Sequence, residues 1–137
     1  MPSPVRFALA GFGAWGKFHA QSIEGNPDAS LIAISAPSEA SREEARKLYP
    51  KAQIFADSLE MIAQSKFDII DIVTPSHTHR EIALAAMAKG KHVLLEKPMA
   101  ITLDECSAMV DACRAAGVHM IVGHSHSFDA PILRLRA

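Results

Sequence analysis

Three glycines near the start of the chain, Gly11, Gly13 and Gly16, have the spacing G-x-G-x-x-G. Between a strand and a helix this spacing is typical of a pyrophosphate-binding turn. The missing side chains permit a tight turn, a close approach of phosphate to the backbone, and close packing of helix on strand. The first turn of the helix, with Ala14 and Trp15, then offers unpaired N–H groups to the phosphates. A dinucleotide is therefore the predicted ligand, and a tight turn without a ligand is the alternative.

The residues after the predicted second strand would contact the adenosine ribose of such a nucleotide. NAD-binding folds usually have an Asp or Glu there, about 20 residues after the glycines, to bind the ribose hydroxyls. This sequence has Ala36 at that point, and Glu39 lies further along the turn. The hydroxyls of Ser35 and Ser38 and the guanidinium of Arg42 would suit a 2′-phosphate instead. The cofactor is thus NAD or NADP, with NADP favoured; the alternative is NAD held by backbone groups, with Arg42 solvated.

Two later loops would face the nicotinamide end of the cofactor. In a doubly wound sheet the ligand lies across the carboxyl ends of the first and fourth strands. The loop after the predicted fourth strand covers residues 74–79, and the loop after the fifth is Glu96-Lys97-Pro98. Lys97 is therefore placed to take a proton from a hydroxyl as hydride leaves the same carbon. A surface turn is the alternative for an isolated Lys-Pro pair.

Apolar strands alternate with alanine-rich helices and would position these residues. The predicted strands are residues 5–10, 31–35, 53–55, 69–73, 93–95 and 119–122. The predicted helices are residues 14–24, 41–48, 57–64, 78–89 and 102–116. Each expected N-cap precedes a Glu by three residues: Ser41, Asp57, Thr78 and Thr102. Gly25, Gly90 and Gly117 fall where helices should end in a left-handed residue. This alternation predicts an α/β fold, a doubly wound parallel sheet of about six strands.

Several other polar residues could do chemistry. Asp71 lies in an apolar strand and should find a hydrogen-bond partner in a neighbouring turn, since an unpaired buried carboxylate is costly. His19 is expected to order the first helix. The pairs His77-x-His79 and His124-x-His126 have no adjacent third ligand, so we expect no metal site.

Composition excludes several classes of protein. The 137 residues are 49% hydrophobic and 21% charged, with a formal net charge of -1, so no overall field points to nucleic acid or anionic membranes. No apolar stretch reaches the ~18 residues that span a bilayer. Cys106 and Cys113 would lie about 10 Å apart on one helix and could not bond to each other. A reducing, cytoplasmic location is the expectation.

Three segments resemble the N-terminal, Rossmann half of the glucose-fructose oxidoreductase/inositol dehydrogenase (Gfo/Idh/MocA) family. They are residues 11–19 (GFGAWGKFH), 74–79 (TPSHTH) and 90–98 (GKHVLLEKP). The likeness runs over nearly the whole chain, and Glu-Lys-Pro is its most specific part. It implies that Lys97 is the catalytic lysine and that Glu96 helps to shape the cofactor site. It also implies three residues at the border of the cofactor: Thr74, Pro75 and His79.

The resemblance further implies two domains. Residues 1–123 would form the NAD(P)-binding domain, and residues 124–137 would begin a linker to a second α/β domain that is missing here. That domain would hold the substrate pocket and usually the interface of a homo-oligomer. Pro98 would follow a cis peptide. Many relatives have an arginine-rich stretch where this chain has His124 and His126, and these histidines are similar to those of phthalate dihydrodiol dehydrogenases.

We therefore expect half of an NAD(P)-dependent oxidoreductase, inactive as a fragment. Hydride would pass between nicotinamide and a secondary alcohol of a small molecule, a cyclic polyol, sugar or aromatic cis-dihydrodiol. One alternative is a non-catalytic dinucleotide-binding sensor or regulatory module, against which Lys97 argues. Another is an S-adenosylmethionine-dependent transferase, which would not need Lys97.

Overall fold

Strands and helices alternate along the chain, as the apolar pattern predicts. The computed structural model describes residues 3–136; residues 1–2 and 137, at the ends of the two predicted domain ranges, lie outside it. The strands are β1 (Val5–Ala10), β2 (Ala29–Ser35), β3 (Gln53–Phe55), β4 (Ile69–Ile72), β5 (His92–Leu95) and β6 (Met120–Val122). The α-helices are α1 (Ala14–Glu24), α2 (Glu39–Leu48), α3 (Ser58–Gln64), α4 (His79–Ala88), α5 (Leu103–Ala116) and α6 (Ala130–Arg136). Short 3₁₀ turns cover Ser76–Thr78 and Ser125–Phe128.

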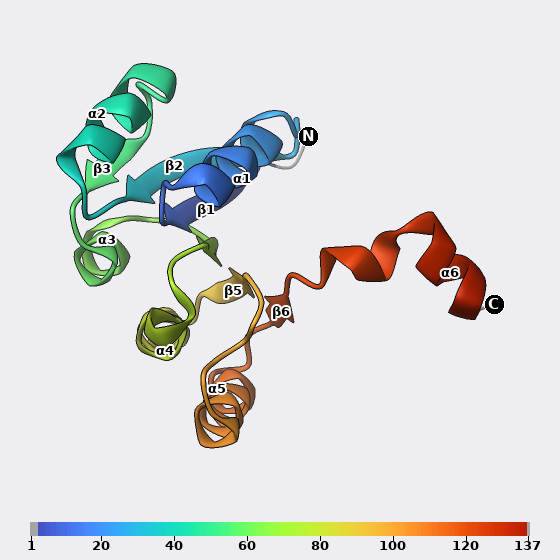
Figure 1. Cartoon of the computed structure of the whole chain (residues 1–137). Coiled ribbons are helices and arrows are strands. Elements are labelled where there is room, and N and C mark those ends of the chain that lie inside the picture. Colours follow the sequence, from blue (N-terminus) through green and yellow to red (C-terminus); the bar gives the residue numbers. More distant parts are fainter. Residues whose placement is uncertain (1–2, 137) are drawn as a thin grey trace.

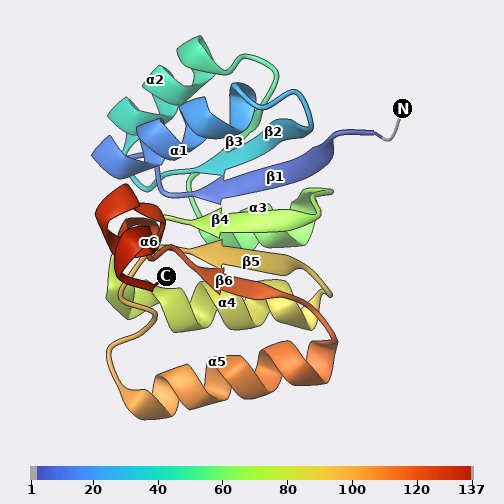
Figure 2. The same cartoon turned by 90° about the vertical axis from the view of Figure 1, so that its right-hand side faces the viewer.

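The strands form one parallel sheet in the order β3-β2-β1-β4-β5-β6. Helices α1 and α2 cover one face of its first half, and α3, α4 and α5 pack on the opposite face (Figure 1, Figure 2). The chain order reverses between β1 and β4, where a doubly wound sheet opens a ligand crevice at the carboxyl ends of its strands. The predicted fold is confirmed.

Alternation along β1 explains how one short strand serves both layers. Ala8 and Ala10 belong to the apolar cluster under α3 and α4, whereas Leu9 belongs to the cluster under α1 and α2. Successive side chains of a strand point to opposite faces, so a strand buried on both faces reads as a nearly continuous apolar run. The same reason accounts for the apolar run of β4.

Two of the predicted helix starts have the expected caps. The Asp57 carboxylate accepts a hydrogen bond from the Glu60 N–H at the start of α3. Thr102 and Glu105 form the reciprocal capping box at the start of α5. In both cases the local sequence is enough to predict the cap, because the capping residue and its partner are three residues apart.

The other two predicted caps are wrong. Helix α2 begins two residues earlier than expected, since the Ser38 hydroxyl, and not that of Ser41, is the N-cap and accepts from the Ser41 N–H. The Thr78 side chain caps nothing in α4, because its hydroxyl lies 2.7 Å from both the Thr74 hydroxyl and the Pro75 carbonyl. A serine or threonine hydroxyl near a helix start can bond to the first turn of the helix or to the loop before it. The backbone conformation decides which of the two bonds forms.

Glycine conformation at helix ends follows the prediction at two of three positions. Gly90 and Gly117 have φ of +68° and +65°, as left-handed C-terminal residues should. Gly25 has φ of −75°, so the prediction is wrong there: its N–H donates to the Gln21 carbonyl within a right-handed turn.

The edge of the sheet near β6 carries an exposed apolar surface. Figure 2 shows β5 and β6 without a covering helix on the α1 side, and α6 projects away from the sheet (Figure 1). Ile121 on β6 is 63% exposed. Over residues 3–136, no helix is both long and apolar enough to cross a membrane.

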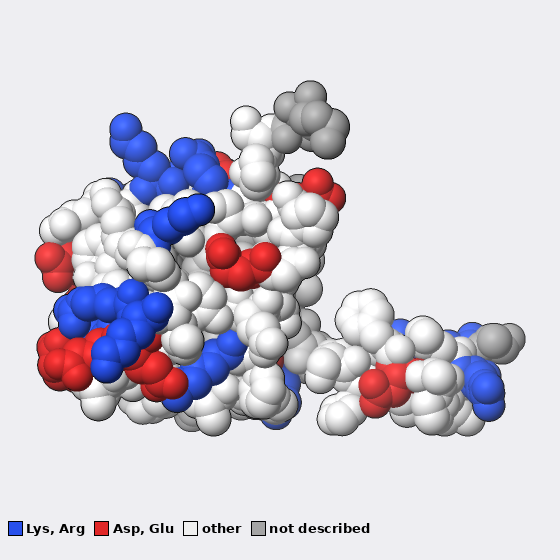
Figure 3. All heavy atoms as spheres, turned by 90° about the horizontal axis from the view of Figure 1, so that it is seen from above, with Lys and Arg blue, Asp and Glu red and all other residues white. Residues whose placement is uncertain are grey.

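Charges of both signs are interspersed over α1 and α2 (Figure 3). Arg42 and Arg46 both pair with Glu39 on α2, and Lys17 on α1 pairs with Glu44. Opposite charges therefore largely cancel on this face, in keeping with the small net charge of the chain.

Candidate functional site

A cleft of about 600 Å³ opens at the carboxyl ends of β1, β2 and β4. It lies where the chain order of the sheet reverses, the expected ligand position in this architecture. Its walls come from the glycine turn, the end of β2, the start of α3 and the loop after β4. The residues that line it and bear on the argument below are Gly11, Gly13, Ala36, Ser38, Thr74 and Pro75.

The three glycines of the turn differ in what the fold requires of them. Gly11 has φ of +100°, and a Cβ on it would lie 2.6 Å from the Val73 carbonyl oxygen. A Cβ on Gly16 would overlap the Gly11 carbonyl. A Cβ on Gly13 would meet nothing within 4 Å. The first and third glycines are thus needed by the protein itself, whereas the space over Gly13 is a cradle that a side chain would fill.

The start of α1 is favourable for a diphosphate. Gly13 is the N-cap, has no side chain to cap the helix, and the first turn contains no acidic residue. The first N–H groups of a helix lack intrahelical acceptors and carry the positive end of its dipole. The backbone N–H groups of Ala14 and Trp15 are therefore available to a phosphate. The Trp15 ring packs edge-to-face on the Phe18 ring, with 5.6 Å between the ring centroids. The site fits a dinucleotide phosphate.

The predicted 2′-phosphate residues are not brought together as free ligands. Ser35 is buried, and its hydroxyl lies 2.8 Å from that of Ser58. The Ser38 hydroxyl caps α2. The Arg42 guanidinium donates to the carbonyls of Ala36 and Pro37 and pairs with Glu39. Of the three predicted residues only Ser38 lines the cleft, because the fold uses the polar groups of the other two to fasten the end of β2.

The loop after β4 borders the cleft through Thr74 and Pro75 but not through the His79 ring. His79 is only 1% exposed. Its Nε2 lies 2.9 Å from the Thr74 carbonyl, and its Nδ1 lies 3.0 Å from the Pro98 carbonyl. The ring therefore ties the loops after β4 and β5 together, and it is not among the residues that line the cleft.

Glu96 and Lys97 follow β5 on the same edge of the sheet. The Lys97–Pro98 peptide is cis. The Lys97 side chain is exposed, and its backbone N–H donates to Glu96 Oε2 at 3.2 Å. No three His, Cys, Asp or Glu side chains within residues 3–136 gather as metal ligands would.

A histidine between two carboxylates is the feature that sequence reasoning missed. His19 Nδ1 lies 2.7 Å from Asp71 Oδ2, and His19 Nε2 lies 3.1 Å from Glu96 Oε1. The hydrogen bond to Asp71 raises the pKa of His19, and burial raises the pKa of Asp71. The sequence predicts that the partner of Asp71 lies in a neighbouring turn, but the partner is His19 of α1. The lone carboxylate within the apolar β4 run was the signal available.

Comparison with known proteins agrees with the geometry. A profile described as the Gfo/Idh/MocA oxidoreductase family, NAD-binding Rossmann fold, matches residues 5–124. The chain is 39% identical over 106 residues to a 1-carboxy-3-chloro-3,4-dihydroxycyclohexa-1,5-diene dehydrogenase of Comamonas testosteroni, covering 77% of this chain and 27% of that protein. It is 29% identical over 130 residues to a Bacillus subtilis scyllo-inositol 2-dehydrogenase (NAD(+)), covering 94% and 38%.

Solved structures show the same relationship. The crystal structure of the WlbA dehydrogenase from Bordetella pertussis in complex with NADH and UDP-GlcNAcA superposes with a TM-score of 0.91 at 30% identity, covering 96% of this chain and 40% of that one. The chain thus spans 27% to 40% of the length of these relatives. From its glycine turn to its Glu-Lys-Pro loop, the chain belongs to the Gfo/Idh/MocA oxidoreductase family and is its NAD-binding Rossmann domain.

Proposed function

We propose that this domain binds NAD or NADP for an enzyme that oxidises a secondary alcohol of a small cyclic molecule. The observation that carries the proposal is the space over Gly13. The protein itself places no atom within 4 Å of a Cβ there, and the φ of Gly13 is an ordinary −80°. A ligand that lies against the backbone explains why a side chain is absent at this position.

Lys97 is the proposed proton acceptor. The cofactor supplies a hydride acceptor when bound. The Lys97 amine would take the proton of the hydroxyl whose carbon is oxidised to a ketone, while the hydride of that carbon would pass to the cofactor. The Glu96 carboxylate accepts a hydrogen bond from the backbone N–H of Lys97, and Thr74 and Pro75 line the nucleotide cleft. In this proposal Lys97 transfers the proton, Glu96 holds the Lys97 backbone, and Thr74 and Pro75 border the nucleotide.

The substrate class is proposed from the relatives. One acts on a carboxylated dihydroxycyclohexadiene and another on scyllo-inositol, both six-membered rings with neighbouring hydroxyls. A suitable panel is therefore scyllo-inositol, myo-inositol and a carboxylated cis-dihydroxycyclohexadiene.

The division of the chain is also a proposal. We assign nucleotide binding to residues 1–123 and a linker to the substrate domain to residues 124–137. In support, the 3₁₀ turn Ser125–Phe128 and α6 lie beyond the last strand, and α6 stands apart from the sheet (Figure 1). Phe128 and Leu135 are exposed on this segment and would pack against that second domain.

Nucleotide titration of the chain tests the proposed function. Trp15 is the single tryptophan and lies in the glycine turn, so its fluorescence should report binding. We expect saturable quenching by NADH or NADPH with Kd below about 1 mM, within the usual range of cofactor and substrate affinities. If neither nucleotide changes the Trp15 signal up to that concentration, the proposal fails.

The cofactor preference gives a second prediction, because Arg42 is held by Glu39. Glu39→Gln should free the Nη2 end of Arg42, whose Nη1 still donates to the Ala36 and Pro37 carbonyls, and should remove a negative charge near the expected ribose position. NADPH affinity should rise about 2- to 5-fold relative to NADH, the size of an exposed ion pair. The control is Glu43→Gln, which removes the same charge from the exposed side of the same helix. An unchanged NADPH/NADH ratio in Glu39→Gln would exclude Arg42 as a 2′-phosphate ligand.

A further inference from the structure

Asp71 is a carboxylate in a place where packing alone favours an apolar residue. It is 1% exposed in β4, and its register partners on the flanking strands are Leu9 and Leu94. Its Oδ2 lies 2.7 Å from His19 Nδ1, whereas its Oδ1 is buried with no hydrogen-bond partner among the described residues. Burying a carboxylate is costly unless it is paired, and replacing a buried ion pair by apolar side chains often leaves stability unchanged or higher. The pair therefore calls for a role other than stability.

His19 connects the buried Asp71 to the loop after β5. Its Nε2 lies 3.1 Å from Glu96 Oε1, and the other oxygen of Glu96 accepts the Lys97 N–H. Glu96 is the first residue beyond β5, and its own N–H still donates to the Ile72 carbonyl. The side chain of Glu96 is thus the link between the ordered end of the sheet and the lysine. Its orientation is set by a histidine on α1, the helix that starts at the glycine turn.

We propose that His19 is a positioning residue: by joining Asp71 to Glu96 it holds the backbone of Lys97 at the carboxyl edge of the sheet. The inference rests on the proposed function, in which Lys97 accepts the substrate proton. It adds that the helix that binds the diphosphate and the loop that holds the proton acceptor are fastened to each other through one imidazole.

The protonation of His19 makes this link sensitive to pH. The titratable groups that face His19 among the described residues are Asp71 from β4 and Glu96 after β5. As a cation, His19 donates to both carboxylates; as a neutral ring it has one N–H. The shorter, more buried contact to Asp71 keeps that proton. The contact to Glu96 is therefore present at low pH and is lost as pH rises through the pKa of His19, which lies above its ordinary 6.5.

The first experiment compares His19→Gln with Lys97→Ala in the enzyme with its substrate domain, using the best substrate of the panel above. For His19→Gln we expect kcat to fall about 10- to 100-fold, because small displacements of a reacting group are costly, while Kd for NADH stays within about 3-fold. If kcat stays within about 2-fold although Lys97→Ala is inactive, the positioning role is wrong and the proposed function stands. If Lys97→Ala turns over normally, the proposed role of Lys97 as proton acceptor fails; if the unmodified enzyme oxidises no substrate of the panel, the proposed function itself fails.

A second measurement needs no substrate. In the 137-residue chain, the amide NMR signal of Lys97 should shift with the same pH midpoint as the ring signals of His19. In His19→Gln this shift should vanish. If the amide signal of Lys97 does not shift over the pH range in which His19 titrates, the proposal is wrong, whatever the turnover assays give.

A further variant separates positioning from folding. The double variant His19→Leu with Asp71→Leu, which replaces both partners, should keep the thermal midpoint within a few degrees, because apolar side chains in place of a buried pair often leave stability unchanged and Asp71 lies between Leu9 and Leu94. Its kcat should nevertheless fall as in His19→Gln. A double variant with wild-type kcat would show that the contact between His19 and Asp71 does not serve Lys97.

Discussion

Replacing Lys97 with alanine is expected to lower kcat for oxidation of the panel substrate by about 10²- to 10⁴-fold, the usual effect of losing a general base. The affinity for NADH should stay within a few fold, because the glycine turn and the walls of the cleft are formed by other residues. Steady-state kinetics at saturating nucleotide would give kcat, and fluorescence titration would give the Kd.

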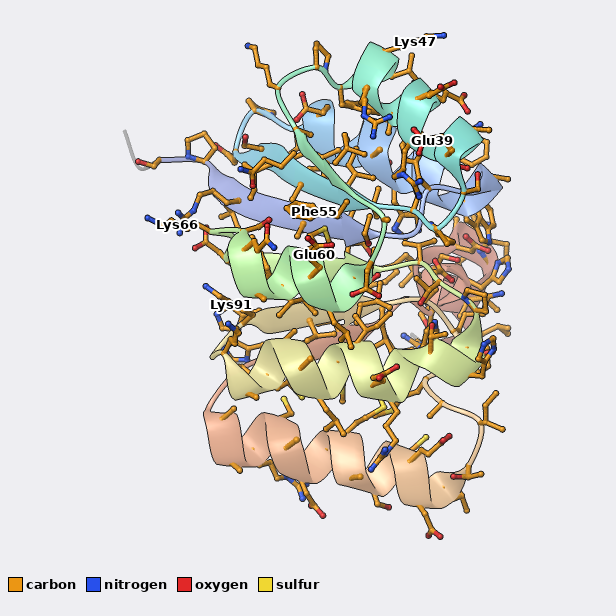
Figure 4. The ribbon with its side chains drawn as sticks, turned by 90° about the vertical axis from the view of Figure 1, so that its left-hand side faces the viewer. Glu39, Lys47, Phe55, Glu60, Lys66 and Lys91 are labelled. Atoms are coloured by element: carbon orange, nitrogen blue, oxygen red, sulfur yellow. The ribbon has the colours of Figure 1, made fainter. Side chains whose placement is uncertain are left out.

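Two control variants make this result specific. Lys97→Arg keeps a positive charge but cannot act as a base, since the guanidinium stays protonated, so its kcat should be as low as that of the alanine variant. Lys66→Ala removes the same type of side chain from the opposite, amino-terminal edge of the sheet, where Lys91 also lies (Figure 4), and should behave as wild type. Turnover that survives in Lys97→Ala would show that Lys97 is not the proton acceptor, whereas an unmodified enzyme that turns over no substrate of the panel would favour the alternative of a non-catalytic binding or sensor module.

The second large effect is expected at Gly13. A valine there should weaken NADH binding by about 100-fold or more, corresponding to about 2.7 kcal/mol, because its side chain would occupy the space where the diphosphate meets the backbone. The fold should tolerate it: φ is −80°, and a Cβ meets no atom within 4 Å. Loss of the N-cap glycine should cost at most about 1 kcal/mol, so the thermal midpoint should fall by only a few degrees.

Gly11→Ala is the matched contrast from the same turn. The left-handed φ of +100° and the 2.6 Å approach to the Val73 carbonyl should lower the free energy of unfolding by about 2–4 kcal/mol. Calorimetry and NADH titration of the two variants should therefore separate a glycine needed by the ligand from a glycine needed by the fold. Wild-type NADH affinity in Gly13→Val would refute the diphosphate site.

Local patterns predicted most of the secondary structure because the interacting groups are close in sequence. Helix α1 has its predicted bounds, and the capping box of Thr102 and Glu105 joins residues three apart. The same locality explains the failures. Ser38 and Ser41 are both suitable caps, and the backbone at the end of β2, fastened by Arg42, selected the earlier one.

The amino-acid sequence by itself determined the order of strands and helices, the glycine turn and the edge of the sheet on which Lys97 lies. Hydrophobic period, turn chemistry and parallel crossovers are properties of short segments, so they can be read without knowing what packs on what. Tertiary structure alone decided which polar groups meet. His19 contacts Asp71 and Glu96 across 52 and 77 residues of chain, and the His79 ring turns beneath the cleft to bind the Pro98 carbonyl. Those pairings depend on how far each helix is rotated and shifted on the sheet, which is set by the packing of both layers at once and by no single segment.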